Sequence, residues 1–351
     1  MRSSRPYKAR AQDDRLKNLF DGIFRIGIVK FEILTGYFIF LFQYFEVESM
    51  DSQPIYREKI DLDILIQKSQ ELMDNLESCT LCPHACRVNR KKGEIGHCRA
   101  GMELEVASYG PHYGEEAPLV GYRGSGTIFF HHCPMHCIYC QNWTISQGHG
   151  EKISIETLAG YMEELQALGC HNINLVTPTH YLPQILAAIV MVVRNGLNIP
   201  IVYNCGGYES TATLKKLDGI IDIYLPDAKY SNKETAEKLS GISGYPEAMK
   251  AALKEMHRQV GDLKVDQQGI AQRGLFIRHL VLPNHLAGTQ EIIAFIAEKI
   301  SPTAAINIMA QYYPTYHAFQ CPSLNRRLSR QEYEEALKIA HDVSPHFQLN
   351  F

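Results

Sequence analysis

Residues 131–142 read His-His-Cys133-Pro-Met-His-Cys137-Ile-Tyr-Cys140-Gln-Asn, and this stretch decides how the rest of the chain is interpreted. Its three cysteines stand at the spacing C-x₃-C-x₂-C. Three thiolates can hold three irons of a [4Fe–4S] cluster and leave the fourth iron open, whereas four thiolates would close the cluster. The alternatives are a structural zinc site that includes a nearby histidine, and a disulfide pair with a spare thiol.

From Gly126 onward, short β-rich runs alternate with helical patterns. The expected strands are 127–130, 172–177, 201–203, 221–225, 275–282 and 305–309. Apolar residues at every third or fourth position predict helices after Ser154, over 182–193, around 247–260 and over about 329–340. Six strands that alternate with helices predict the α/β class and a parallel sheet with right-handed crossovers. Periodicity alone does not separate an open doubly wound sheet from a curved partial barrel.

Polar side chains gather where the expected strands end. Thr177 ends the second strand, Asn204 follows the third, Asp227 and Lys229 follow the fourth, and Arg278 lies in the fifth. Functional groups on such sheets collect at the carboxyl ends of the strands, because the loops converge there. Asp227 and Lys229 are two residues apart in a strand-like stretch and so share a face. The alternative for this pair is a surface ion pair, worth ~0–1 kcal/mol.

The three-cysteine motif, with the aromatic Tyr139 before its last cysteine, resembles the signature of the radical S-adenosylmethionine (SAM) enzymes. This resemblance implies a partial (β/α)6 TIM-like barrel, with a [4Fe–4S] cluster on Cys133, Cys137 and Cys140. It also implies that SAM binds the open iron through its amino and carboxylate groups. One electron from the cluster would then split the sulfonium and free a 5′-deoxyadenosyl radical, which abstracts hydrogen from the substrate.

From about residue 78 to its end, the chain resembles one subfamily, the uncharacterised homologues of pyruvate formate-lyase activating enzyme. The blocks that carry this resemblance are 172–180, 202–204, 222–227 and 277–283. In glycyl-radical-enzyme activating enzymes an Asp-x-Lys motif lies beside SAM, and Asp227 and Lys229 match it. Arg278 resembles the fifth-strand arginine of the same enzymes. A structural arginine that is paired in the core is the alternative for Arg278.

The chain differs from the family in the motif that binds the amino group of SAM. Most radical SAM proteins carry Gly-Gly-Glu after the second strand, whereas this chain reads Val-Thr-Pro-Thr-His over 176–180. A Gly206-Gly-Tyr-Glu209 run occurs one strand later. We therefore expect Thr177 or Asn204 to hold the amino group.

A second group of cysteines precedes the barrel. Cys79, Cys82, Cys86 and Cys98 stand at C-x₂-C-x₃-C-x₁₁-C, with glycines before the last cysteine that allow tight turns. Four thiolates are enough for a closed tetrahedral site. Zinc and an auxiliary [4Fe–4S] cluster fit equally by ligand type, and burial without metal is a third alternative. The extra clusters of the activating enzymes come after the first strand, so their role does not carry over.

The first 49 of the 351 residues differ from the rest. They begin with a basic stretch and reach an aromatic run over 33–45, which at 13 residues is shorter than the ~20 that a membrane helix needs. We expect Met50 to be the true start and residues 1–49 to be a non-native or disordered extension; a membrane anchor is the alternative. Residues 50–117 are expected to form an N-terminal helix and Cys-rich module, and residues 118–351 the radical SAM core domain.

Composition limits the setting in which the protein works. The apolar fraction of 45% is ordinary for a globular protein, and the net charge of −3 implies no nucleic-acid partner and makes a membrane partner an unfavoured expectation. Seven of the ten cysteines fall between Cys79 and Cys140. Such clustering indicates metal binding in a reducing compartment, and we expect the cytoplasm.

The sequence therefore predicts a radical SAM iron–sulfur enzyme of the oxidoreductase type with an unknown substrate. The resemblance suggests that it activates a glycyl radical protein with an electron donor such as flavodoxin or ferredoxin. One alternative is a radical SAM enzyme that modifies a small molecule or a peptide. The other is a zinc-stabilised binding protein without SAM chemistry.

Overall fold

The computed structural model describes residues 53–349, and its centre is a single curved sheet. The strand order is β10-β9-β8-β6-β5-β4-β2-β1-β3. The six predicted strands correspond to β2 (Ser125–Phe130), β4 (Ile173–Val176), β5 (Ile201–Cys205), β6 (Ile223–Pro226), β8 (Ala271–Leu280) and β9 (Ala305–Met309). Each is parallel to its neighbour among these six, as predicted.

Four further strands extend the sheet and were not predicted. β1 (Leu104–His112) is antiparallel to β2, and β3 (Glu151–Ile153) is antiparallel to β1. β10 (Gln348–Leu349) is parallel to β9, and β7 (Lys264–Val265) is antiparallel to β8. β1 carries Gly110 and Pro111, residue types that normally indicate a loop, and the other three strands are too short to show a period.

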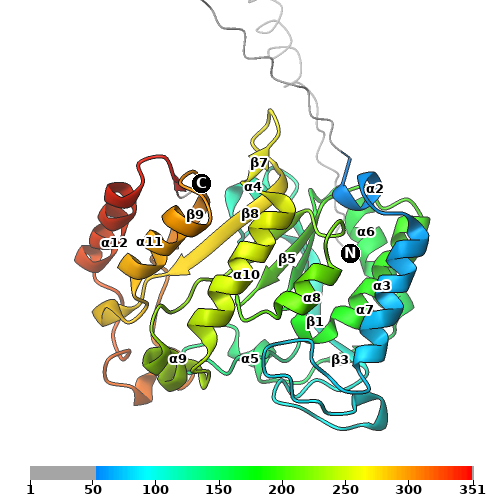
Figure 1. Ribbon diagram of the computed structural model, residues 1–351, viewed down its shortest axis with the longest axis horizontal. Coiled ribbons are helices and arrows are strands. Elements are labelled where there is room, and N and C mark those ends of the chain that lie inside the picture. Colours follow the sequence, from blue (N-terminus) through cyan, green and yellow to red (C-terminus); the bar gives the residue numbers. More distant parts are fainter. Residues whose placement is uncertain (1–52, 350–351) are drawn as a thin grey trace, which may run out of the picture. The chain divides into compact units, whose positions relative to one another are not determined.

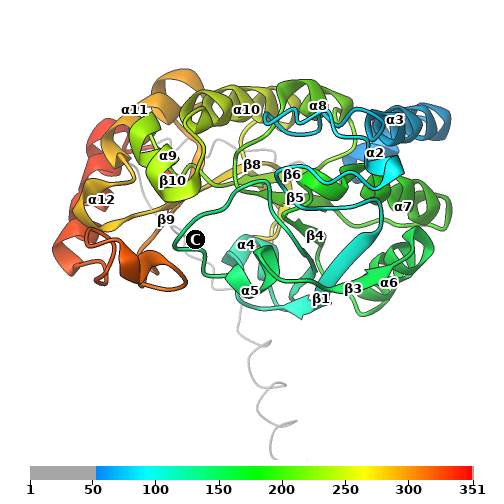
Figure 2. The ribbon, with the colours of Figure 1, turned by 90° about the horizontal axis from the view of Figure 1, so that it is seen from below.

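Helices cover one side of this sheet. The longer ones are α3 (Leu62–Asn75), α6 (Ile155–Ala167), α7 (Leu182–Arg194), α8 (Thr211–Lys216), α9 (Lys233–Ser240), α10 (Tyr245–Val260), α11 (Thr289–Lys299) and α12 (Arg330–Val343). Short helices are α2 (Ile55–Glu58), α4 (Ala117–Val120) and α5 (Trp143–Ser146). Figure 1 shows the strands with helices around them, and Figure 2 shows the helices as an arc outside the strands from α12 to α6. The α/β partial barrel is confirmed, and among the described residues the sheet does not close on itself.

Local sequence explains where two of these helices begin. The Ser154 hydroxyl accepts a hydrogen bond from the Thr157 N–H at 3.1 Å and caps α6. Ser329 and Glu332 form a reciprocal capping box at the start of α12. These caps satisfy backbone N–H groups at the starts of the two helices and so define where each helix begins.

The segment before the barrel is tied to the sheet by a buried carboxylate. Asp222 accepts hydrogen bonds from the N–H groups of Ile55 at 2.6 Å and Ile201 at 2.9 Å. Burial raises the pKa of Asp222 to about 7, although these two donors oppose the shift. Together with the packing of α3 against α7, this contact places the chain that leads into the first four cysteines against the barrel.

The expectations for residues 1–49 lie outside the described residues. Within residues 53–349, no helix is both long enough and apolar enough to cross a membrane. The boundary between residues 117 and 118 stays a prediction.

Candidate functional site

One cavity of about 210 Å³ brings together the predicted site residues of the barrel. Its walls include Cys133, Cys137, Tyr139, Cys140, Thr177, Asn204, Asp227, Lys229 and Arg278. Strand register explains the meeting, because Val176 pairs with Asn204 and Asp227 forms a parallel bridge with Arg278. The second cysteine group, Cys79, Cys82, Cys86 and Cys98, lines a separate narrow cavity.

Each sulfur of the three-cysteine loop, residues 131–142, lies beside a potential hydrogen-bond donor. The Met135 N–H donates to Cys133 at 3.3 Å, and the Ser240 hydroxyl donates to Cys137 at 2.9 Å. Cys140 lies 3.3 Å from a serine hydroxyl of α5. Burial raises the pKa of Cys133 well above its usual range and also raises that of Cys137. A metal centre would therefore have to displace protons from these thiols.

The spacing of the sulfurs distinguishes between kinds of metal centre. A tetrahedral zinc ion with Zn–S bonds of about 2.3 Å brings its sulfurs to about 3.8 Å from one another. Within residues 53–349, no three cysteine sulfurs all lie within 4.8 Å of one another. The ligands of a [4Fe–4S] cluster bind separate irons and lie farther apart than the ligands of one ion. The geometry of Cys133, Cys137 and Cys140 therefore fits a cluster better than one zinc ion.

A chain of hydroxyl groups supports the three-cysteine loop from behind. The Tyr230 hydroxyl donates to the Tyr139 hydroxyl at 2.6 Å and lies 2.7 Å from the Ser240 hydroxyl, which reaches Cys137. All four residues are buried. Tyr139 thus holds the loop in place as well as lining the cavity. Tyr230 and Ser240 were missed because no motif marks them.

A buried network of charges forms the opposite wall. Lys229 Nζ lies 2.6 Å from Asp227 Oδ2, and Arg278 Nε lies 2.9 Å from Asp227 Oδ1. The side chains of Lys229, Asp227 and Arg278 are 17%, 16% and 16% exposed. These low exposures disfavour the alternative of a surface ion pair.

The protonation states of this network follow from its contacts. Burial alone would raise the pKa of Asp227, but Arg278 and Lys229 hold it below its usual range. Burial would lower the pKa of Lys229, but Asp227 and Cys137 raise it. Two cations thus face Asp227 in the cavity, and Glu115 and Glu116 act on Arg278 from the segment before α4 and offset part of its charge.

A neighbouring carboxyl group adjusts this charge. Glu115 Oε2 lies 3.5 Å from Arg278 Nη1, and burial raises the pKa of Glu115 to about 7, although Arg278 opposes the shift. Glu115 precedes α4, in a segment without a periodic pattern, and sequence reasoning missed it for that reason.

Asn204 presents an unused donor. Its Oδ1 accepts a hydrogen bond from Arg278 Nη2 at 2.6 Å, which fixes the orientation of the amide. Its buried Nδ2 has no hydrogen-bond partner. An unsatisfied buried donor costs about 1–3 kcal/mol, so this group is suited to an acceptor atom on a ligand. The role of Asn204 toward an ammonium group stays a prediction, but this orientation favours a carboxylate or hydroxyl.

Thr177 lies beside Asn204 in a strained conformation. Its backbone has φ 58°, a left-handed value that is rare for a β-branched residue, and its N–H donates to the Asn204 carbonyl at 2.8 Å. Such strain often marks a ligand-binding loop.

The Gly206-Gly-Tyr-Glu209 run has a packing role in this structure. Glu209 is buried and accepts hydrogen bonds from Thr179 at 2.7 Å and Tyr203 at 2.9 Å, which joins the loops after β4 and β5. It does not line the main cavity. A Cβ atom on Gly207 would lie 2.1 Å from the Asp227 carbonyl oxygen, so glycine is required for this close approach.

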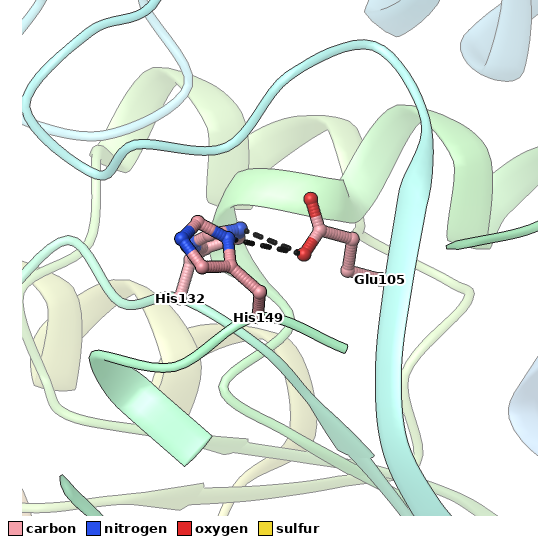
Figure 3. A group of neighbouring side chains, drawn as sticks. All are labelled: Glu105, His132 and His149. Atoms are coloured by element: carbon pink, nitrogen blue, oxygen red, sulfur yellow. Dashed lines mark ion pairs between the residues drawn. The ribbon is translucent and has the colours of Figure 1, made fainter. Parts of the chain in front are cut away.

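A polar group borders the three-cysteine loop at its start. Glu105 Oε2 lies 3.3 Å from His132 Nε2 and 3.7 Å from His149 Nδ1 (Figure 3). Burial lowers the pKa of His132, so its ring is neutral near pH 7. Among the described residues, this is the one set of three His, Cys, Asp or Glu side chains with ligand atoms within 4.8 Å of one another. His149 is 84% exposed, and the firm contact is the one that holds His132, next to Cys133.

The four-cysteine site, Cys79, Cys82, Cys86 and Cys98, shares its cavity with Arg90 and His180. Arg90 is buried, and its guanidinium donates to the backbone carbonyls of Gly101 and His180. The structure thus gathers the four predicted ligands around one centre and places a cation beside them.

Comparisons with known proteins bear on this site. Residues 127–266 match the model of the radical SAM superfamily. The uncharacterized protein MJ0674 of Methanocaldococcus jannaschii is 35% identical over 289 residues, which are 80% of this chain and 78% of that protein. The uncharacterized protein MJ0808 of the same organism is 27% identical over 165 residues, 42% of this chain and 48% of that protein.

Two solved structures show partial similarity. HydG, a maturase of the [FeFe]-hydrogenase, is 13% identical with a TM-score of 0.43, and the match covers 62% of this chain and 48% of that one. Methylornithine synthase (PylB) is 16% identical with a TM-score of 0.41, and the match covers 60% of each chain. The matched part of this chain spans about half the length of HydG.

Proposed function

The chain belongs to the radical SAM superfamily, and from this premise we propose that it is an iron–sulfur enzyme that reductively cleaves SAM. The 5′-deoxyadenosyl radical formed in this way would abstract hydrogen from a substrate. One observation carries the proposal: the three cysteines line the same cavity as two cations, Lys229 and Arg278, that are held by Asp227.

The three-cysteine loop suits the cluster. Cys133, Cys137 and Cys140 would hold three irons, and their wide spacing and neighbouring donors fit separate iron ligands. When bound, the [4Fe–4S] cluster supplies one electron to the sulfonium of SAM. The Ser240 and Met135 donors would stabilise the added negative charge on the sulfurs.

The opposite wall suits the methionine part of SAM, which carries a carboxylate and an ammonium group. Lys229 and Arg278 offer positive charge, and Asp227 holds both of them by short contacts. Asn204 Nδ2 offers a further donor. Thr177 remains the candidate contact for the ammonium group of SAM. Tyr139 would hold the three-cysteine loop against the bound SAM.

Apolar side chains complete the cavity. They are Phe129, Met135, Ile145, Val176, Leu280 and Met309. These side chains limit the access of water, which protects a carbon radical from side reactions and strengthens the charge contacts around it.

For the substrate, we propose a glycine residue of a partner protein, with a small molecule or a peptide as the rival. The Asp227–Lys229 motif and Arg278 support the activating-enzyme form. The electron donor would be a one-electron carrier such as flavodoxin or ferredoxin, and the compartment would be the cytoplasm. A zinc-stabilised binding protein is the alternative function, and the wide spacing of the cysteine sulfurs disfavours it.

The test is anaerobic reduction of the reconstituted protein with SAM, followed by measurement of 5′-deoxyadenosine. We expect broad visible absorption from the cluster and formation of 5′-deoxyadenosine. A folded, iron-loaded protein that leaves SAM intact would overturn the proposal. Deuterium transfer into 5′-deoxyadenosine from labelled protein or small-molecule fractions then separates the substrate classes.

A further inference from the structure

The four-cysteine site has a geometry that its sequence spacing left open. All four cysteines line one narrow cavity, so they share a centre. No three of their sulfurs lie within 4.8 Å of one another, whereas a tetrahedral zinc ion needs about 3.8 Å. The cysteines thus line one centre, and no three of their sulfurs are as close to one another as the ligands of one zinc ion.

We propose that Cys79, Cys82, Cys86 and Cys98 hold a second [4Fe–4S] cluster, so that the chain carries two. Four thiolates occupy all four irons, so this cluster would be closed, unlike the one on the three-cysteine loop. This inference does not depend on SAM cleavage and goes beyond the proposed function.

Charge around the site agrees with a cluster. Four thiolates on a [4Fe–4S] core leave a net negative charge beside the buried Cys79 and Cys98, and such a charge is costly without compensation, although Cys86 is exposed. Arg90 lines the cavity and is buried, which places a permanent cation beside the cluster. The N–H groups of His84 and Ala100 also face Cys82 and Cys98, so two of the sulfurs have backbone donors.

The backbone wraps closely around this centre. Ala85, Arg87 and Arg99 adopt left-handed φ values of 43°, 58° and 64°, and each is next to Cys86 or Cys98. Such values are unfavourable for residues other than glycine and persist where surrounding contacts enforce them. A Cβ atom on Gly96 would lie 3.0 Å from the Cys86 sulfur, so glycine lets the chain pass close to this ligand.

The site lies directly against the three-cysteine loop. His84 Nε2 is 2.9 Å from the Pro134 carbonyl oxygen, and the rings of His97 and His136 stack with their centroids 4.5 Å apart. Pro134 and His136 lie between the cysteines of that loop. On the proposed function, an electron from an external one-electron donor protein could thus reduce the second cluster and pass from it to the first.

The test uses the full chain with Cys133, Cys137 and Cys140 all changed to Ala, which leaves the four-cysteine site intact. After anaerobic reconstitution, we expect about four irons and four sulfides per chain, with the electron paramagnetic resonance signal of a reduced [4Fe–4S] cluster. One zinc without iron, or no metal in the folded protein, would overturn the proposal. Loss of SAM cleavage in this variant says nothing against the second cluster, so the two proposals fail separately.

The wild-type chain gives an independent measurement if the triple variant does not fold. We expect about eight irons in the wild-type protein and about four after Cys79→Ser with Cys98→Ser. Four irons and one zinc in the wild-type protein would contradict the proposal. Cys170→Ala is the matched control, because Cys170 is buried and lines neither cavity, and its iron content should equal that of the wild-type protein.

Discussion

The two cysteine groups of this chain differ in what surrounds them more than in how they are spaced. The three-cysteine loop opens into a cavity of about 210 Å³ whose far wall carries Lys229, Asp227 and Arg278. The four-cysteine site lines a narrow cavity with Arg90 as its cation. The three-cysteine loop, which lacks a fourth ligand, therefore has room and charged groups for a second molecule beside it, whereas the four-cysteine site has only a narrow cavity.

The groups also resemble each other in one respect. In both, the N–H of the residue two positions after a cysteine faces its sulfur, at Met135, His84 and Ala100. Such donors tune the charge and potential of a metal centre. The two groups therefore share backbone N–H donors to their sulfurs but differ in the space beside those sulfurs. Only the three-cysteine loop has a cavity in which a ligand can bind and react.

The largest expected effect is the loss of SAM cleavage in Cys137→Ala. This change removes one iron ligand of the open cluster and leaves the Ser240 hydroxyl without its sulfur partner. We expect 5′-deoxyadenosine to fall to background while the iron of the four-cysteine site remains. The Cys170→Ala variant should cleave SAM at the wild-type rate. Full cleavage of SAM by Cys137→Ala would contradict the assignment of SAM chemistry to the three-cysteine loop.

The corresponding change in the four-cysteine site is Cys98→Ala. We expect the iron content to fall by about half and the melting temperature to drop, because a bound metal centre stabilises the folded state. Anaerobic iron and sulfide analysis and thermal melts measure both effects. SAM cleavage should be reduced but still measurable, since the open cluster keeps its three ligands. An unchanged iron content would show that this cysteine is not a ligand.

Much of this organisation could be predicted from the sequence. The six parallel strands, the α6 and α12 helix starts and the meeting of Asn204, Asp227 and Arg278 follow from periodicity, capping residues and the rule that loops converge at strand ends. These features depend on local patterns or on parallel register. The family resemblance favoured the partial barrel over the open doubly wound sheet.

The remainder depends on contacts that no local pattern encodes. Tyr230 follows β6 and Ser240 ends α9, and these positions come together behind Cys137 only in the folded chain. Glu115 reaches Arg278 from a segment before the barrel, and Glu209 joins the loops after β4 and β5. The kind of metal centre could not be read from the sequence either, since zinc and iron–sulfur clusters use the same cysteine spacings.

A smaller effect is expected for Lys229→Ala, which changes only the cavity beside the three-cysteine loop. We expect SAM affinity to fall about tenfold to a hundredfold, as measured by anaerobic equilibrium dialysis of the iron-loaded protein. Stability should fall by less than the about 3–5 kcal/mol typical of breaking a buried ion pair, because Arg278 still neutralises Asp227. Lys233→Ala, with a side chain 65% exposed, is the control. A lower melting temperature with unchanged SAM affinity would make Lys229 structural.

The smallest effect concerns pH and separates the two sites electrostatically. Burial and the adjoining Glu116 raise the pKa of Glu115 to about 7, so between pH 6 and pH 8 the hydrogen-bonded pair Glu115 and Glu116 loses a proton and gains negative charge beside Arg278. That charge cancels part of the positive field that would attract the SAM carboxylate, so wild-type SAM affinity should weaken as pH rises, by roughly fivefold.

Glu115→Gln remains neutral, so it should lose less affinity over the same range, and comparing the two proteins removes any titration of SAM itself. Glu209, whose pKa burial also raises to about 7, acts on Cys82 of the four-cysteine site, so any pH dependence of that site should be the same in the wild-type protein and in Glu115→Gln. An equal pH dependence in both proteins would exclude Glu115 as the group that sets the charge of the open site.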